Sequence, residues 1–261
     1  MLLKLQMMTK LVPMSNSPYA DIVEVLQASH KVVICGHVSP DGDCLGSQLA
    51  LAAALRVLGK NVTCLLAQNE ELDYGLRFLP GADDMVPAAQ FNDSFDTFVT
   101  VDVPNADRMG EVAKALHAQA QYTATIDHHI AEKPLSQVNY VDSHAAATAM
   151  LIWQLIKELS IQPTADMATC CYAGVLTDTG RFQYQNTTAE VLRVAADIVS
   201  CGADPAEVAR HVYQNRSRSS LALEQRMLAN LEVMGEGAFA VSHLMRSDFV
   251  ETGATKADAE P

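Results

Sequence analysis

Aspartate and histidine side chains gather in four short segments of this 261-residue chain, and such a mixture of side chains is suited to metal binding. The segments contain His37, Asp41, Asp43, Asp102, Asp127, His128, His129 and Asp178. Several carboxylates that meet at one place repel one another unless cations lie between them. Mixed carboxylate and imidazole ligands suit manganese, with magnesium, cobalt and zinc as competitors.

Each segment has a plainer explanation when it is taken alone. An Asp-Gly-Asp sequence is usually a turn, a His-His pair is usually part of a polar loop, and the sequence TDTG can simply end a helix. All four segments occur together, however, and each stands at a predicted strand or helix end. This joint occurrence favours a metal site over four unrelated turns.

The elements that must bring these segments together alternate between short strands and longer helical patterns. Runs rich in β-branched residues predict strands over 31–37, 61–67, 95–103, 122–129 and 137–142. Strands separated by helices imply right-handed crossovers, so the predicted fold is α/β, a doubly wound parallel five-stranded sheet with helices on both faces. The carboxyl ends of such strands share one edge, where ligands bind, and the strand-end residues should therefore converge there.

Charge and composition limit the choice of partners. With 18 basic and 31 acidic residues the formal net charge is −13, which argues against a protein that binds long duplex nucleic acid through a basic groove. A small phosphorylated substrate held by metal ions is compatible with this charge. No apolar run approaches the ~20 residues of a membrane span, so we expect a cytoplasmic protein without a membrane partner. The six cysteines form no CxxC pair, and we expect them to be reduced and buried.

Four sequence motifs resemble those of the DHH phosphoesterases. They read GHVSPDGDCLGS, VDVPNADRMG, IDHH and GVLTDTGRF, and VDSHAAATAMLIWQLI is similar to an alanine-rich helix of that family. The resemblance runs from about Tyr19 to the C-terminus. It is closest to the branch that degrades oligoribonucleotides a few residues long and dephosphorylates 3'-phosphoadenosine 5'-phosphate.

This resemblance implies a pair of metal ions, with manganese preferred, bound by six residues of this chain. The ligands of the first ion would be His37, Asp41 and Asp102. The ligands of the second would be Asp43, Asp102, His128 and Asp178, with Asp102 shared between the two ions. The metal pair would activate a water molecule and hold the phosphate for in-line attack, so no protein nucleophile is expected.

Three further residues are candidates for roles beside the metals. The resemblance implies that His129 faces the phosphate and donates to its developing charge. Asp127 would orient the adjacent imidazoles. Arg108 would contact phosphate or pair with an acid, and a solvated surface arginine is the alternative.

The resemblance also suggests how the chain is divided. We expect a disordered or frayed leader over 1–18, a DHH catalytic domain over 19–190 and a helical linker over 191–234. Residues 235–261 would be an incomplete DHHA1 substrate-binding domain, because about 30 residues cannot build a core of their own. The Gly-Gly-Gly-His motif of that domain is absent from the chain, so we expect weak affinity for nucleotide substrates.

The leading hypothesis is therefore a two-metal phosphoesterase that hydrolyses short oligonucleotides, 3'-phosphoadenosine 5'-phosphate, or both. A manganese-dependent inorganic pyrophosphatase is the alternative with the same ligand pattern. A metal-binding module without turnover is a third hypothesis, and a homodimer is left open as the assembly. An exonuclease acting on long single strands is disfavoured by the chain length and the acidic charge.

Overall fold

The computed structural model describes residues 17–69, 72–130, 133–255 and 257–259. The predicted leader lies outside these residues except for Ser17 and Pro18. Ser17 donates a backbone hydrogen bond to the carbonyl oxygen of Asn139, and Pro18 precedes the first helix. Within the described residues, no helix has both the length and the apolar character that crossing a bilayer requires.

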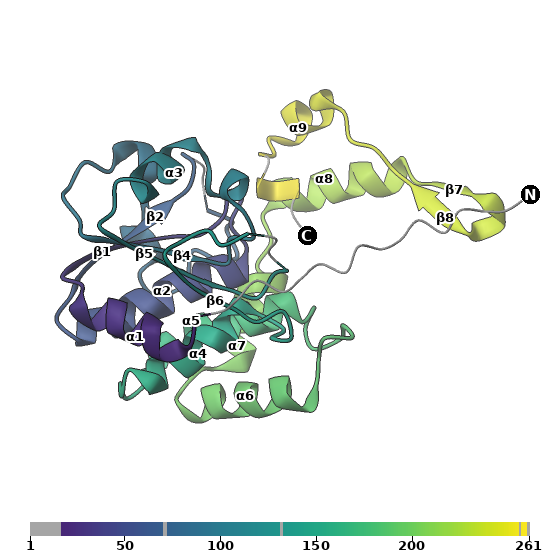
Figure 1. Cartoon of the computed structure of the whole chain (residues 1–261). Helices are drawn as coiled ribbons and strands as arrows, with labels where there is room; N and C mark the ends of the chain where they lie inside the picture. The colour runs from purple at the N-terminus through teal and green to yellow at the C-terminus, as the bar shows by residue number, and fades with distance from the viewer. Residues whose placement is uncertain (1–16, 70–71, 131–132, 256, 260–261) are drawn as a thin grey trace, which may run out of the picture.

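A parallel sheet in the order β3-β2-β1-β4-β5-β6 forms the centre of the molecule (Figure 1). Its strands are β1 (Lys31–Cys35), β2 (Asn61–Leu66), β3 (Val86–Pro87), β4 (Thr97–Val101), β5 (Tyr122–Asp127) and β6 (Val138–Val141). The five predicted strands are all present, which confirms the predicted fold class. The sheet has one strand more than predicted, because β3 is only two residues long and has no sequence pattern of its own.

Helices cover both faces of this sheet, as Figure 1 shows. One face carries α1 (Tyr19–Ala28), α2 (Gly42–Val57), α4 (Thr148–Glu158) and α5 (Ala165–Asp178), and the other carries α3 (Glu111–His117). Successive residues of a strand point to opposite faces, so Val32 and Ile34 pack into the larger core while Val33 and Cys35 pack into the smaller one. Burial on both faces explains why β1 reads as an apolar run after Lys31.

The packing of α2 against α5 depends on glycine at two positions. A Cβ atom at Gly46 would lie 2.3 Å from the carbonyl oxygen of Cys170, and one at Gly174 would lie 2.6 Å from Oδ1 of Asp43. Both distances are too short for any side chain, so glycine lets the two helices approach closely. This brings the C-terminal end of α5 beside the N-terminal turn of α2.

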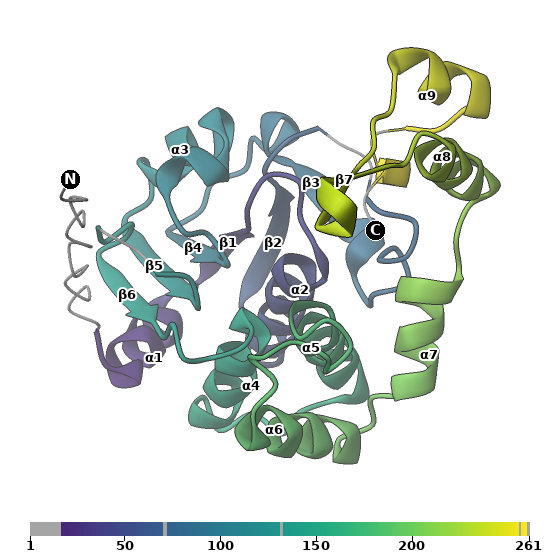
Figure 2. The same cartoon turned by 90° about the vertical axis from the view of Figure 1, so that its right-hand side faces the viewer.

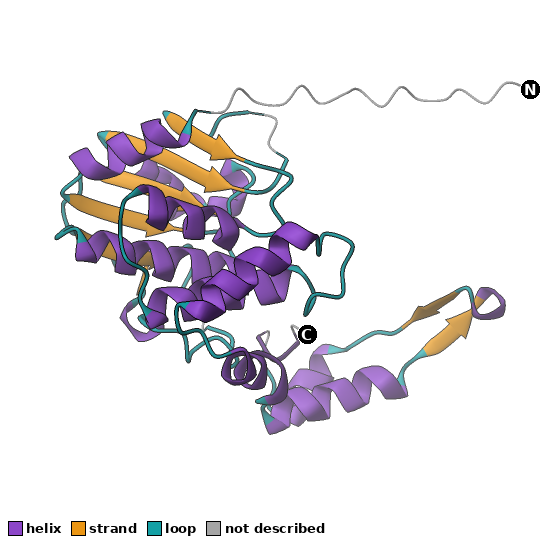
Figure 3. Ribbon diagram, turned by 90° about the horizontal axis from the view of Figure 1, so that it is seen from below, coloured by secondary structure: helices purple, strands orange, loops and turns teal. Residues whose placement is uncertain are grey.

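The rest of the chain is helical up to residue 229 and then forms a small hairpin. It contains α6 (Ala189–Ser200), α7 (Pro205–Ala209), the π-helical turn η4 (Arg210–Gln214), α8 (Arg218–Ala229), β7 (Glu232–Met234), β8 (Phe239–Val241) and α9 (Arg246–Thr252); the 3-10 turns are η1 (Ala82–Asp84), η2 (Ala88–Gln90), η3 (Ala106–Met109), η5 (Gly235–Gly237) and η6 (Ala257–Ala259). Figure 2 shows α8 and α9 beside the main body, and Figure 3 shows the β7–β8 hairpin projecting away from it. The helical linker predicted over 191–234 thus ends in a strand, because β7 pairs with β8 in antiparallel fashion.

Candidate metal centre

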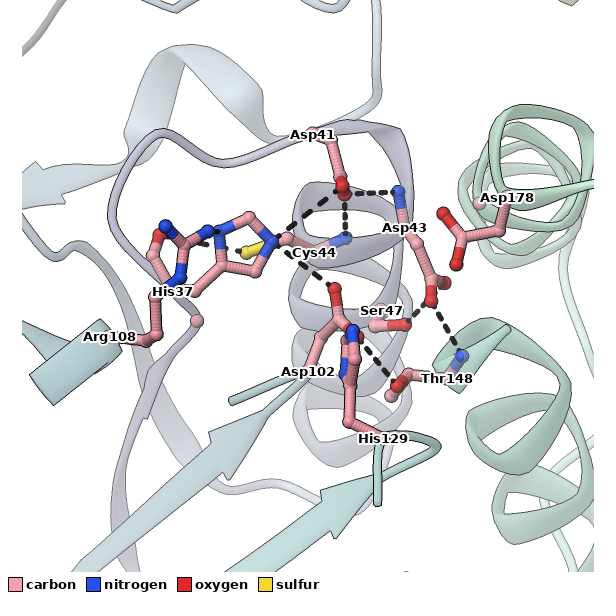
Figure 4. A network of polar contacts seen from close by, with 12 residues as sticks. His37, Asp41, Asp43, Cys44, Ser47, Asp102, Arg108, His129, Thr148 and Asp178 are labelled. Carbon is pink, nitrogen blue, oxygen red and sulfur yellow. Dashed lines mark hydrogen bonds and ion pairs between the residues drawn. The ribbon is translucent and has the colours of Figure 1, made fainter. Parts of the chain in front are cut away.

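The predicted metal ligands converge at the carboxyl edge of the sheet. Figure 4 shows five of them, His37, Asp41, Asp43, Asp102 and Asp178. His37 follows β1, Asp102 directly follows β4, and His128 directly follows β5. Strands β1 and β4 are the neighbours at which the strand order reverses, and open α/β sheets bind ligands at such a point. Asp178 reaches the same place as the last residue of α5.

The turn between β1 and α2 uses Asp41 for two purposes. Its Oδ1 atom accepts hydrogen bonds from the backbone N–H groups of Asp43 and Cys44, both at 3.0 Å, and so caps the N-terminus of α2. Its Oδ2 atom lies 3.7 Å from Nε2 of His37. The residue that starts the helix therefore also presents an oxygen to the neighbouring imidazole.

Asp102 lies between two histidines. Its Oδ2 atom is 3.4 Å from Nε2 of His37, and its Oδ1 atom is 3.5 Å from Nε2 of His128. The side chain is buried, and its backbone adopts a left-handed conformation with φ of 58°. Each oxygen of this carboxylate thus faces a different imidazole, as a ligand shared by two ions would require.

The Nε2 atom of His128 is a buried nitrogen without a hydrogen-bond partner among the described residues. Three carboxylates surround it: Oδ2 of Asp178 at 3.3 Å, Oδ1 of Asp102 at 3.5 Å and Oδ2 of Asp43 at 3.9 Å. Its other nitrogen, Nδ1, lies 3.3 Å from the carbonyl oxygen of Ala145. A proton on Nδ1 leaves a lone pair on Nε2 that points at these oxygens, an arrangement that fits a divalent cation between them.

A hydrogen-bonding residue that the sequence did not reveal is Thr148, the first residue of α4. Its backbone N–H donates to Oδ2 of Asp43 at 2.6 Å, and its hydroxyl donates to Oδ1 of Asp102 at 2.9 Å. The N–H of Ala149 donates to Oδ1 of Asp43 at 2.8 Å. The alanine-rich motif located this helix, but no spacing rule connects Thr148 with carboxylates 46 and 105 residues away.

His129 and Asp127 form a pair at the rim of the centre. Oδ1 of Asp127 lies 2.8 Å from Nδ1 of His129 and also accepts from its backbone N–H at 3.1 Å. This hydrogen bond outweighs the opposing effect of burial and raises the pKa of His129. Asp127 is buried whereas His129 is partly exposed, so the imidazole is held in place yet is accessible to solvent. The structure pairs Asp127 with His129 rather than with His128.

Arg108 lies beside His37 at the edge of the site. Its Nη2 atom is 3.3 Å from Nδ1 of His37, and its carbonyl oxygen accepts from the N–H of Val38. Since Nδ1 is also 2.9 Å from the Val38 carbonyl oxygen, Arg108 can donate to the ring only in the tautomer without a proton on Nδ1. Among the described residues Arg108 pairs with the histidine, and no ion pair with a carboxylate is present.

Burial and mutual repulsion perturb the acids of the centre. The pKa of Asp43 is raised well above 3.8, first by burial and then by the charges of Asp102 and Asp178. Burial, followed by the charges of Asp41 and Asp102, raises the pKa of Asp178 to about 8. Both shifts mean that the folded chain resists the full ionisation of this cluster. A bound cation would remove that resistance.

The imidazole of His37 responds in the opposite sense to the same charges. Burial alone would lower its pKa, but hydrogen bonds with Asp102 and Asp41 outweigh burial and raise it. Burial likewise acts to raise the pKa of Asp41, yet the hydrogen bond and charge of His37 lower it. The nearby thiol of Cys44 is buried, and burial raises its pKa to about 11, so it is not activated as a nucleophile. None of the six cysteines is in a disulfide in this structure, and five are buried as predicted, whereas Cys201 is only partly buried.

Comparisons with known proteins point to one family. Residues 31–175 match the DHH family, N-terminal domain. The chain is 34% identical over 224 residues to the bifunctional oligoribonuclease and PAP phosphatase NrnA of Thermus thermophilus, a match that covers 85% of this chain and 66% of that protein. The protein of the same name from Bacillus subtilis is 25% identical over 244 residues, with coverage of 91% and 73%.

A solved structure of similar fold is an exopolyphosphatase-related protein from Bacteroides fragilis. The TM-score is 0.85 at 25% identity, and the match covers 93% of this chain and 73% of that one. The chain thus spans about two thirds of the length of the Thermus protein and somewhat more of the other two.

Proposed function

Because this chain belongs to the DHH family, we propose that it is a metal-dependent phosphoesterase that hydrolyses short oligonucleotides, 3'-phosphoadenosine 5'-phosphate, or both. The relatives named as oligoribonucleases and PAP phosphatases support this choice of substrate. The observation that carries the proposal is the position of Asp102, with one oxygen toward His37 and the other toward His128. Divalent cations held there would supply an activated water and positive charge for the phosphate oxygens.

The proposed ligand sets are those that the motifs predict. They comprise His37, Asp41 and Asp102 for one cation, and Asp43, Asp102, His128 and Asp178 for the other. Manganese suits this mixture of carboxylates and imidazoles, and magnesium, cobalt and zinc are the competitors. The unpartnered nitrogen of His128 supports this assignment independently of the motifs.

The remaining residues of the centre act on the substrate or on each other. The raised pKa of His129 favours the protonated imidazole, which would donate to the phosphate or the leaving oxygen. Asp127 holds that ring through Nδ1, so Nε2 is the atom left to donate. Arg108 contributes positive charge beside His37.

The proposal extends to organisation and location. Residues 19–190 would form the catalytic domain, 191–234 the linker and 235–261 part of a substrate-binding domain. The enzyme would act in the cytoplasm on small nucleotides rather than on long duplex nucleic acid or membranes. A homodimer stays a prediction, and sedimentation of the purified chain would check it.

Activity assays on metal-free protein test the proposal. Addition of Mn²⁺ should start the hydrolysis of bis(4-nitrophenyl) phosphate and of 3'-phosphoadenosine 5'-phosphate. Asp102→Ala should abolish both activities and reduce the metal content, because the only proposed shared ligand is lost. Faster release of phosphate from pyrophosphate than from either ester would instead indicate a pyrophosphatase. Metal binding without any turnover would indicate a non-catalytic module.

A further inference from the structure

The chain takes an unusual path immediately after the proposed ligand Asp178. Gly180, Arg181 and Phe182 all have left-handed backbones, with φ of 53°, 63° and 61°. For a residue other than glycine this conformation costs about 1–2 kcal/mol, and here two such residues follow each other. Hydrogen bonds fix the turn, since the N–H of Arg181 donates to the Leu176 carbonyl at 2.9 Å. Strain held in this way is typical of functional sites.

The turn directs the Arg181 side chain onto an aromatic ring. The guanidinium carbon lies 3.8 Å from the ring centroid of Tyr213, a cation–π contact. Tyr213 lies in the π-helical turn η4, and its hydroxyl donates to the Leu176 carbonyl oxygen at 3.4 Å. Arg181 forms no ion pair with a carboxylate among the described residues, so its charge is not neutralised by such a pair.

This guanidinium borders a cavity of about 450 Å³ between the main body and α8. The volume is in the range of small-molecule sites. Tyr74 and Arg77 also line it from the main body. The acids in its wall already have partners: Glu224 with Arg216 at 2.5 Å, Asp258 with Ser217 at 2.5 Å, and Asp73 with the N–H of Gly75 at 2.6 Å. Glu224 is thus neutralised by an ion pair, whereas Asp258 and Asp73 are hydrogen-bonded to neutral groups and keep their charge. An anionic group would meet Arg181 in the same wall as two further cationic side chains, Arg77 and Arg216.

We propose that Arg181 and Tyr213 form a subsite for the part of a nucleotide substrate that is not attacked, with the guanidinium binding its second phosphate group. This inference rests on the proposed function, which places the attacked phosphate beside Asp178, three residues before Arg181. A planar guanidinium binds phosphate through two parallel hydrogen bonds and can also stack on a base. The ring of Tyr213 holds the guanidinium in one orientation before the ligand arrives.

Calorimetric binding of 3'-phosphoadenosine 5'-phosphate and of adenosine 5'-monophosphate, measured in EDTA so that the ligand is not hydrolysed, tests the subsite without requiring turnover. Arg181→Ala should weaken binding of the bisphosphate by about 10- to 100-fold, the usual effect of losing a charged hydrogen bond. Binding of the monophosphate, which has no second phosphate, should weaken far less. Arg181→Lys should recover part of the loss, because it keeps the charge but not the planar fork.

Arg218→Ala is the matched control, because it removes the same charge from an exposed residue that does not line the cavity. It should change neither affinity nor activity. Hydrolysis of bis(4-nitrophenyl) phosphate by Arg181→Ala should fall by less than about threefold, since this ester has no second phosphate.

Equal affinities of the parent and Arg181→Ala for the bisphosphate would overturn the subsite, as would the absence of bisphosphate binding by the parent. Arg181→Ala could also weaken binding of the bisphosphate, binding of the monophosphate and hydrolysis of the small ester by the same factor. That result would show that Arg181 acts at the metals, and it would overturn the subsite as well. Intact bisphosphate binding without any metal-dependent hydrolysis would contradict the proposed function and leave the subsite supported.

Discussion

At the scale of single residues, Asp102 shows how backbone conformation decides what a carboxylate can reach. Its backbone is left-handed, and one carboxylate oxygen lies toward His37 and the other toward His128. Aspartate tolerates this conformation better than most side chains. A residue with the extended backbone of the preceding strand would not aim its carboxylate in the same direction. The conformational free energy that this backbone costs therefore accompanies the orientation that lets Asp102 be shared by the two proposed ions.

Alanine substitutions of the two adjacent histidines should have different effects, because one residue is proposed to bind metal and the other to donate a proton. His128→Ala should lose both metal and activity, because the Nε2 atom that faces three carboxylates is removed. His129→Ala should keep near-normal metal content while activity falls by about 10²–10³, the effect of removing one transition-state donor. Metal analysis and kcat measured on the same preparations check this. Indistinguishable behaviour of the two variants would show that the assignment of separate roles is wrong.

At the scale of secondary structure, the N-terminus of α4 is capped by a residue from another helix. The residue at the cap position is Ala147, which has no side-chain acceptor, and the carboxylate of Asp43 receives the first free N–H groups instead. The partial positive charge at a helix N-terminus stabilises such a carboxylate. Helices α2 and α4 are therefore joined at the metal centre itself.

Thr148 should act as a positioning residue for this junction. Thr148→Val keeps the backbone N–H and the side-chain shape but removes the hydroxyl that donates to Asp102. We expect metal affinity to fall about 10- to 100-fold, the usual effect of losing a partner of a ligand, while the melting temperature of the metal-free protein changes little. Thr148→Ser retains the hydroxyl and should retain the affinity. Equal metal affinities of the valine variant and the parent, titrated calorimetrically, would refute this role.

The sequence predicted the elements that depend on local pattern. The five longer strands lie within the predicted ranges. Strands β1 and β4 are buried along almost their whole length and are rich in β-branched residues, the pattern that predicts strands, whereas the edge strand β6 is only partly buried. The segments that carry the proposed ligands also meet as predicted, because the carboxyl ends of parallel strands must share one edge.

The elements that depend on distant contacts could not be predicted in this way. Strand β3 is defined by its pairing with β2 and is too short for a pattern. The segment Glu232–Met234 continues a helical pattern, but it pairs with Phe239–Val241 instead. Thr148 and the contact of Arg181 with Tyr213 join residues far apart in sequence, so no local spacing reveals them.

At the scale of the whole molecule, the metal centre opposes the folding of the metal-free chain at neutral and higher pH. Burial, followed by the charges of Asp41 and Asp102, raises the pKa of Asp178 from its usual value of 3.8 to about 8 in the folded protein. Between these values the folded chain binds more protons than the unfolded chain, so its stability falls as pH rises. The raised pKa values of Asp43 and His37 act in the same direction. The lowered pKa of Asp41 matters only in more acidic solution, where its carboxylate would become protonated.

Asp178→Asn should therefore stabilise the metal-free protein, and more so at pH 8 than at pH 5. At pH 5 the Asp178 carboxyl of the folded chain is largely protonated and resembles the amide, whereas at pH 8 the penalty for burying its charge is close to complete. In a domain of this size, each kcal/mol gained in the free energy of unfolding should raise the melting temperature by about 2–4 °C. The difference between the two proteins reports Asp178 together with its effect on Asp43, because the charge of Asp178 contributes to the raised pKa of Asp43. Thermal unfolding followed by circular dichroism in EDTA measures this difference at each pH.

Mn²⁺ should reverse the order of stability at pH 8. It binds only the folded chain with its ligands assembled, so it should raise the melting temperature of the parent. The variant has lost a ligand and should gain much less. A destabilised asparagine variant in EDTA at pH 8 would show that the Asp178 charge supports the metal-free fold. In that case repulsion among the acids of this centre would not destabilise the metal-free fold.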